Sequence, residues 1–203
     1  MTSTTQHQVR QRLPQGWIEF IAHGERTPSE WLEWYLASSE GWMSDEGRAS
    51  VTAGFHAGVQ AFADASFAFA GVSIILGEHP SISFMGTQVL VHPEQDAAKG
   101  LHSLLPLVRF GEDSVAETFR SPDERVGTIV RGTREIDGRA WLVAIGEMAL
   151  PDDAGTVVVT GIGSDPEQEQ VLLLSVAFAL VTTQLLADGE SPQEVPMFPT
   201  AAV

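Results

Sequence analysis

The hydrophobic pattern is strongest between residues 155 and 187, where a strand pattern passes directly into a helix pattern. The β-branched run at residues 157–159 is apolar on both faces of an extended chain, and Gly161 and Gly163 close it. A run of this kind is typical of a central strand that is covered on both sides. We therefore expect a buried strand at the centre of a sheet.

The next residues predict a long helix over 166–186. Ser164 occupies the N-cap position, where its hydroxyl would accept a hydrogen bond from a free backbone amide. Glu167 completes a Ser-x-x-Glu capping box, and Pro166 stands where a missing donor costs little. These residues predict where the helix begins.

From Val171 onward the predicted helix is apolar around almost its whole circumference, and only Ser175 and Thr182 mark a weakly polar edge. Such a helix is buried in a core, paired with another chain or inserted in a membrane. The apolar run falls short of the about 20 residues that span a bilayer, and neither flank carries Lys or Arg. The pattern favours a buried core helix.

Two helices are predicted near the N-terminus. Thr27, Pro28 and Glu30 form a capping box with proline at the first helical position, and this helix should break near Gly41. A second helix is predicted over 46–65 from apolar residues at helical spacing. Three glycines oppose the second helix, since each costs up to ~1 kcal/mol relative to alanine in a helix interior.

The other apolar segments have the composition of strands, namely 17–21, 67–76, 82–91, 115–119, 125–136 and 139–150. Asp137-Gly138 is the dipeptide of a tight hairpin turn. Strands joined by short turns are antiparallel neighbours, because a parallel pair needs a connection of about a dozen residues or more. With a short helix predicted over 96–108, the sequence indicates the α+β class: a helix–sheet–helix sandwich around a mainly antiparallel sheet, with a long C-terminal helix.

Length and composition indicate one domain. The chain has 203 residues, of which 43% are hydrophobic, and no internal stretch has the composition of a linker. We expect a single α/β domain over residues 13–187, a disordered N-terminus over 1–12 and a flexible C-terminal tail over 188–203.

The net charge of -16 argues against nucleic acid and anionic membrane surfaces as partners, because both are polyanions. The chain has no cysteine, which excludes disulfides, thiolate metal ligands and a cysteine nucleophile. Its first residues are polar and lack the apolar core of a signal peptide, so a cytoplasmic location is predicted.

The order of these segments resembles the PsbP-like fold, shared by the PsbP subunit of photosystem II and the Ran-binding Mog protein and similar to small uncharacterised proteins of high-GC bacteria. The resemblance covers about residues 13–186 and rests on RLPQGWIEF, a helical pair, a hairpin ending in VLVHP, a short helix, RGTRE, AWLVAIGEMAL, and TVVVTGIGSDPEQE before the apolar helix. It implies a non-enzymatic binding module without catalytic residues. The acidic charge gives no support to a photosynthetic or Ran-binding role.

Candidate metal ligands do not form a recognisable motif. No pair of histidines has the Glu-flanked helical spacing of a zinc protease, and we assign neither a metal nor a cofactor. The histidines considered are His7, His23, His56, His79, His92 and His102.

Ser164 invites a catalytic interpretation because it follows Gly161-Ile162-Gly163. A dinucleotide fingerprint would need a third glycine where Pro166 stands, and a nucleophile elbow would need Gly-x-Ser-x-Gly. We favour strand termination and helix capping for this segment. A small hydrolase that uses Ser164 remains as the enzyme hypothesis.

Glu147 is unusual because it shares a strand face with Trp141 and other apolar residues. If it were buried, its pKa would be raised and it could act as a general acid or base. The alternative is an ion pair with Arg131 or Arg134 on the neighbouring strand, where the hairpin register places Glu147 opposite Thr128. We assign no catalytic residue.

The leading functional hypothesis is a non-enzymatic domain that binds another protein, with Trp34 and Trp42 as partner-binding residues. At about 100 degrees per residue, Trp34 falls outside the apolar arc of its helix and should be at least partly exposed. Exposed tryptophan is enriched among interface hot spots. An acidic secretion or assembly chaperone is the alternative, and a homodimer is compatible with the sequence. The inward arc consists of Trp31, Leu32, Tyr35 and Leu36.

Overall fold

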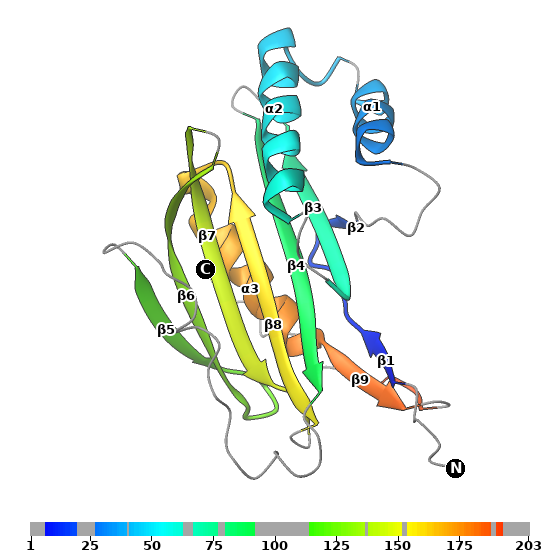
Figure 1. The fold of residues 1–203 in the computed structure, drawn as a ribbon, viewed down its shortest axis with the longest axis vertical. Coiled ribbons are helices and arrows are strands. Elements are labelled where there is room, and N and C mark those ends of the chain that lie inside the picture. Colours follow the sequence, from blue (N-terminus) through cyan, green and yellow to red (C-terminus); the bar gives the residue numbers. More distant parts are fainter. Residues whose placement is uncertain are drawn as a thin grey trace.

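A seven-stranded antiparallel sheet with helices on both faces forms the frame of the protein (Figure 1). The computed structural model describes residues 7–19, 27–39, 41–62, 67–76, 80–91, 114–136, 138–151, 154–187 and 190–192. The strand order is β2-β3-β4-β8-β7-β6-β5, and every neighbouring pair is antiparallel. This architecture confirms the predicted α+β class and the helix–sheet–helix sandwich.

The strands of this sheet are β2 (Ile18–Glu19), β3 (Phe69–Ile75), β4 (Ser81–Val91), β5 (Val115–Arg120), β6 (Val126–Ile136), β7 (Arg139–Ala149) and β8 (Gly155–Gly163). The helices are α1 (Pro28–Ser38), α2 (Asp45–Phe62) and α3 (Glu169–Thr182), with a short 3-10 helix η4 (Pro166–Gln168) before α3. A separate two-stranded sheet pairs β1 (His7–Arg10) with β9 (Gln184–Ala187).

The local signals in the sequence correspond to these elements. Residues 157–159 are buried in β8, which lies between β4 and β7 as a central strand. The β6–β7 hairpin has the predicted register, with Ile136 opposite Arg139, and Gly138 adopts a positive φ of 72°. The capping box of α1 is also present, because Thr27 and Glu30 each accept a hydrogen bond from the backbone amide of the other.

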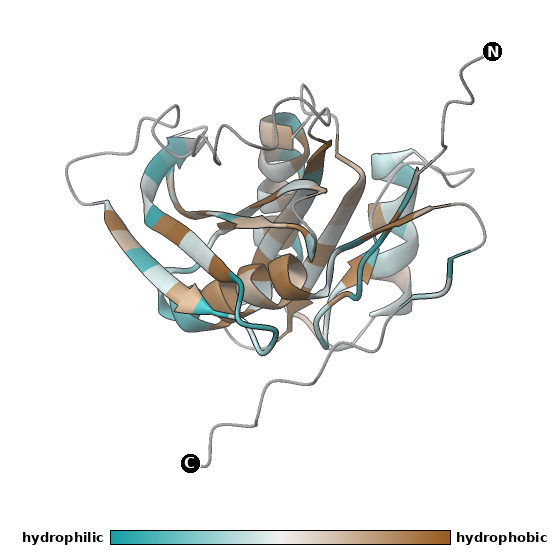
Figure 2. Cartoon of the chain, turned by 90° about the horizontal axis from the view of Figure 1, so that it is seen from below, coloured by the Kyte–Doolittle hydropathy of each residue, from teal (hydrophilic) through white to brown (hydrophobic). Residues whose placement is uncertain are grey.

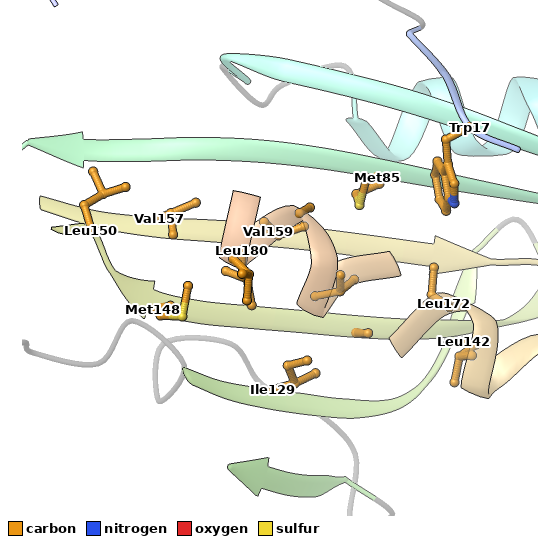
Figure 3. Close-up of a cluster of buried hydrophobic side chains, with 14 residues drawn as sticks. Trp17, Met85, Ile129, Leu142, Met148, Leu150, Val157, Val159, Leu172 and Leu180 are labelled. Carbon is orange, nitrogen blue, oxygen red and sulfur yellow. The ribbon is translucent and has the colours of Figure 1, made fainter. Parts of the chain in front are cut away.

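Each face of the sheet carries its own hydrophobic core. Figure 3 shows the first core, in which side chains of β4, β6, β7 and β8 point toward α3. The second lies between the opposite face and α1 and α2, where Phe55, Phe84 and Trp141 are among the largest buried side chains. The helices before and after the strands therefore cover opposite faces of one sheet, as Figure 1 shows.

The glycines of α2 have a packing role that offsets their low helix propensity. A Cβ atom built on Gly54 would lie 2.7 Å from Cγ2 of Ile82, and one built on Gly58 would lie 2.0 Å from Cε2 of Phe84. These residues let the helix backbone approach β4 closely. The predicted helix is thus confirmed over Asp45–Phe62 despite its glycines.

Two predictions about the ends of the domain are wrong. His7–Arg10 forms β1, although the sequence predicts disorder over 1–12. The C-terminal helix ends at Thr182 because Thr183 is extended, and Gln184–Ala187 forms β9 where the helix was expected to continue. The helix predicted over 96–108 and most of the tail lie outside the described residues.

Among the described residues, no helix has both the length and the hydrophobicity that crossing a membrane requires. The predicted cytoplasmic location stays a prediction.

Candidate functional site

Helix α3 packs closely on the middle of the sheet because β7 and β8 carry glycines beneath it. A Cβ atom on Gly146 would lie 2.6 Å from Cδ1 of Leu180, and one on Gly161 would lie 2.9 Å from Cγ2 of Val176. Leu180 and Val176 are accordingly fully buried. The helix covers the sheet from β4 to β6, and β5 extends beyond it as the outermost strand.

The polar edge of α3 faces inward. Ser175 is buried, accepts a hydrogen bond from Nε1 of Trp17 at 3.0 Å and donates one to the carbonyl of Val171 at 2.8 Å. Thr182 is also buried and donates to the carbonyl of Phe178 at 2.8 Å. The two hydroxyls that interrupt this apolar helix are therefore satisfied inside the protein.

The outward face of α3 is apolar. The exposed fraction of Leu174 is 60% and that of Val171 is 50%, so both side chains meet solvent, whereas the hydroxyls of Ser175 and Thr182 on the same helix are buried. Figure 2 colours α3 mostly brown, the hydrophobic end of its scale. We call this surface, formed by Val171 and Leu174 with the half-buried Leu173 and Ala177, the outer face of α3.

A groove of about 230 Å³ runs between the outer face of α3 and the edge of the sheet. It is the candidate functional site because its lining combines apolar side chains with charged ones. The lining residues are Glu117, Thr118, Phe119, Arg120, Ile129, Arg131, Gln170, Leu173, Leu174 and Ala177.

Phe119 shapes the β5 side of the groove. It stands opposite Gly127 in the β5–β6 register, and a Cβ atom on Gly127 would lie 2.4 Å from carbon atoms of the Phe119 ring. The missing side chain on β6 therefore leaves room for the aromatic ring. Because Phe119 is held against the sheet in this way, it forms part of a preformed apolar wall.

An ion-pair network lies at one end of the groove and joins its three elements. The guanidinium of Arg131 on β6 donates to Oε1 of Glu117 on β5 from Nε at 3.2 Å and from Nη2 at 3.1 Å. Its Nη1 also donates to Oε1 of Glu169 at the start of α3. Exposed pairs of this kind contribute about 0–1 kcal/mol each, so the network positions the groove wall more than it stabilises the fold.

The strand register excludes an ion pair between Glu147 and Arg131, which the sequence leaves open. Glu147 does lie opposite Thr128 as predicted, but Arg131 lies opposite Ala144, which faces α3. Side chains alternate between faces along a strand, so Glu147 projects to the other face of the sheet, with Trp141. Arg134 is opposite Trp141, about 20 Å from Glu147 at about 3.3 Å per residue, so it too is out of reach.

Ser164 does not cap the helix as predicted. Its hydroxyl accepts a hydrogen bond from the amide of Ile82 at 3.0 Å, and its own amide donates to the carbonyl of Ile82 at 2.9 Å. Asp165 is the N-cap instead, because its carboxylate accepts from the amide of Glu167 at 2.9 Å and so starts η4. Ser164 ties the end of β8 to the start of β4.

Ser164 also lines a cavity of about 330 Å³ between α2 and the start of β7. The described residues around this cavity include Arg139, Asp165 and Glu167 but no histidine, so none of them is an imidazole base for the serine. The hydroxyl is already engaged with the backbone of β4. The geometry therefore offers no support to the hydrolase hypothesis.

The predicted partner-binding tryptophans lie on the other side of the sheet. The exposed fraction is 48% for Trp34 and 72% for Trp42, which confirms the expected exposure of Trp34. On the inward arc of α1, Leu32 and Leu36 are buried, and Trp31 stacks on Phe55 with ring centroids 5.6 Å apart. Because α1 lies beside α2 (Figure 1), these tryptophans are separated from the α3 groove by the sheet.

Among the described residues, no three His, Cys, Asp or Glu side chains are placed to hold a metal ion. His23, His79, His92 and His102 lie outside the described part of the chain. The residues that line the groove were not predicted from the sequence. The signal for the groove was present in the surplus of apolar residues around α3, beyond what one buried face requires.

No known family model matches this chain, and no curated protein matches it. Among solved structures, the chain is similar to LpqN, described as involved in cell envelope biogenesis of Mycobacterium tuberculosis, with a TM-score of 0.41 and 11% sequence identity. The superposition covers 90% of this chain and 86% of LpqN. A likeness this distant carries no functional conclusion, and the resemblance to the PsbP-like fold stays a prediction.

Proposed function

We propose that this protein is a non-enzymatic binding domain that docks another protein in the groove between α3 and β5. The observation that carries this proposal is the exposed apolar face of α3, because Leu174 and Val171 meet solvent while Ser175 and Thr182 are buried. An apolar helix is explained by burial, by pairing with another chain or by a membrane. Burial accounts for only the inward face of α3, and pairing with another chain accounts for the outer face.

The energetics favour an apolar contact at this surface. Burial of a large aliphatic side chain contributes about 1.5–3 kcal/mol. Because Leu174 and Val171 are largely exposed, folding does not realise much of this free energy, and a partner that covers them would. The groove adds concave shape and the Arg131–Glu117–Glu169 network, which fixes its walls before binding. Preformed walls lower the ordering cost of association.

Leu174→Ser tests this function directly. Tagged wild-type protein, Leu174→Ser and the matched control Leu90→Ser are expressed in the native host, and bound proteins are identified by mass spectrometry. Leu90 is an exposed leucine on β4 that does not line the groove. We expect a protein that wild type and Leu90→Ser retain and Leu174→Ser loses, with an affinity loss of about tenfold for the purified pair. Equal retention by all three would contradict docking at this groove.

We further propose that Trp34 and Trp42 form a second contact with a protein partner. Both side chains are exposed on the α1 side of the sheet, and truncated hot-spot tryptophans typically cost about 2 kcal/mol or more of binding energy. Trp34→Ala should leave the melting temperature nearly unchanged and weaken binding of the partner found above by about that amount. Unfolding of Trp34→Ala would place Trp34 in the core and remove this contact.

A secretion or assembly chaperone would use the same surfaces for its client. The identity of the retained protein separates this alternative from a stable binding domain, because a client is released when it is secreted or assembled.

A further inference from the structure

We infer that the segment docking in the α3–β5 groove is amphipathic and positively charged, with an apolar anchor side chain and Lys or Arg residues around it. This inference rests on the protein-binding function proposed above and defines the chemistry of the partner. It follows from the size of the groove, the charges at its rim and the net charge of the chain.

The volume of the groove limits which apolar side chain of the partner can dock in it. A groove of about 230 Å³ is larger than the apolar cavity of about 150 Å³ that holds a benzene molecule, so it accommodates one or two large side chains of a partner. Phe119, Leu173 and Leu174 supply apolar walls for such a side chain. The partner segment must therefore present leucine, phenylalanine or a comparable residue toward the groove, and its remaining side chains meet the rim.

The charged side chains that line the groove are Glu117, Arg120 and Arg131, and each arginine is paired with at least one carboxylate. Arg131 is shared by two carboxylates, Glu117 and Glu169, and Arg120 is paired with Glu124 at 3.3 Å. Each arginine is thus neutralised within the protein, and one carboxylate is in excess. Glu117 has an exposed side-chain fraction of 57% and can accept further hydrogen bonds from a partner cation.

The net charge of the chain extends this preference beyond the rim. At -16, the protein attracts cationic segments at long range and accelerates their association. The same charge repels a second copy of this chain, which would bring an equal negative charge to the contact. A basic partner therefore fits the groove better than a homodimer.

Peptide selection tests the inference. A display library of random 16-residue peptides is selected on the wild-type protein, with removal of every peptide that also binds Leu174→Ser. We expect the enriched peptides to carry a net positive charge and to place two or more large apolar residues on one side. Synthetic copies of these peptides are then measured by fluorescence anisotropy at about 50 mM and about 300 mM salt, where a charged contact weakens with screening.

Charge variants give the second readout. We expect Glu117→Gln and Glu169→Gln each to weaken the selected peptide about two- to fivefold, the range of an exposed ion pair. Glu33→Gln is the matched control, because Glu33 is exposed on α1 outside the groove lining and should leave binding unchanged. Thermal melts of all variants verify that they fold.

Three outcomes would overturn the inference. Enriched peptides that depend on Leu174 but are neutral or acidic would reject the positive charge and leave the protein-binding function standing. The absence of any Leu174-dependent peptide would show that no apolar side chain of a short segment docks in the groove. The pull-down with Leu174→Ser then tests the proposed protein-binding function separately, because it can still retain a folded partner. Sedimentation that shows a Leu174-dependent dimer would assign the groove to a second copy.

Discussion

Helices α2 and α3 pack on opposite faces of one sheet by the same device and differ in what they present to solvent. In α2 the glycines that allow close packing belong to the helix, where Gly58 faces Phe84. In α3 they belong to the sheet, where Gly146 and Gly161 lie under Leu180 and Val176. Both arrangements bring a helix backbone close to the strands.

The outer faces of the two helices are opposite in character. Helix α2 exposes polar residues such as Asp45, Glu46 and Gln60, as a surface helix of a globular protein does. Helix α3 exposes Val171 and Leu174. The fold does not require an apolar outer face on a helix, because α2 covers its core without one. The stability of the fold therefore does not explain the outer face of α3, and the proposed binding to a partner does.

The largest expected effect is a difference in unfolding free energy between substitutions on the buried face and on the outer face of α3. Leu180→Ala removes a fully buried side chain above Gly146 and should lower the free energy of unfolding by about 2–5 kcal/mol. Leu174→Ala should change it by less than about 0.5 kcal/mol, because Leu174 is mostly exposed. Urea unfolding of both variants measures the difference. Comparable losses would show that the outer face belongs to the core.

The next effect tests the glycine contact of α2. Gly58→Ala places a methyl group inside the contact distance of the Phe84 ring and should destabilise the protein by about 1–3 kcal/mol through overpacking. Gly47→Ala is the control, since it brings the same gain of up to ~1 kcal/mol in helix propensity, while its Cβ would lie 3.1 Å from Cγ of Pro80, a tight contact but much looser than the 2.0 Å at Phe84. Thermal melts should place Gly58→Ala well below this control. Similar melting temperatures would contradict close packing at Phe84.

The smallest effect concerns the C-terminal end of α3, which Arg125 holds in place. Its Nη2 donates to the carbonyl of Val181 at 3.2 Å and its Nη1 to that of Ala149 at 2.7 Å, while its Nε donates to Asp123 at 2.7 Å. Burial raises the pKa of Asp123, but the hydrogen bonds from Ser121 and Arg125 outweigh it and hold this pKa below its usual value of 3.8.

Because the pKa of Asp123 is lowered in the folded state, the contact between Asp123 and Arg125 is sensitive to acid. The ionised carboxylate of Asp123 stabilises the fold above pH ~3.8, and the contribution is lost as the pH falls through the lowered folded-state pKa. Asp123→Asn should therefore be less stable than wild type near neutral pH, and the difference should shrink from about pH 5 to about pH 3. Melts across this range measure it. A difference that is constant with pH would exclude ionisation of Asp123 as its cause.

The sequence by itself determined the features that depend on neighbouring residues. The capping box of Thr27 and Glu30 and the turn at Gly138 involve residues a few positions apart, so their physical causes are present in any short stretch of the chain. The antiparallel hairpin of β6 and β7 follows from its turn in the same way. The apolar circumference of α3 was equally visible.

Only the tertiary structure decided the features that join distant residues. The hydroxyl of Ser164 meets Ile82 on β4, so it is not available as the N-cap that the local pattern indicates. The chain leaves its helical path after Thr182 because residues 184–187 pair with β1, at the far end of the sequence. Long-range pairing overrides local preference, since each backbone group takes the partner that the assembled fold brings to it.

The candidate site belongs to this second group. The sequence shows that α3 has more apolar surface than one core face needs, but it does not show which residues remain outside. That choice depends on Gly146 and Gly161, which set the side of the helix that approaches the sheet, and on β5, which is the outermost strand and faces α3 across the groove. Burial of Ser175 against Trp17 then turns Leu174 toward solvent, because side chains at neighbouring positions of a helix point in directions about 100 degrees apart.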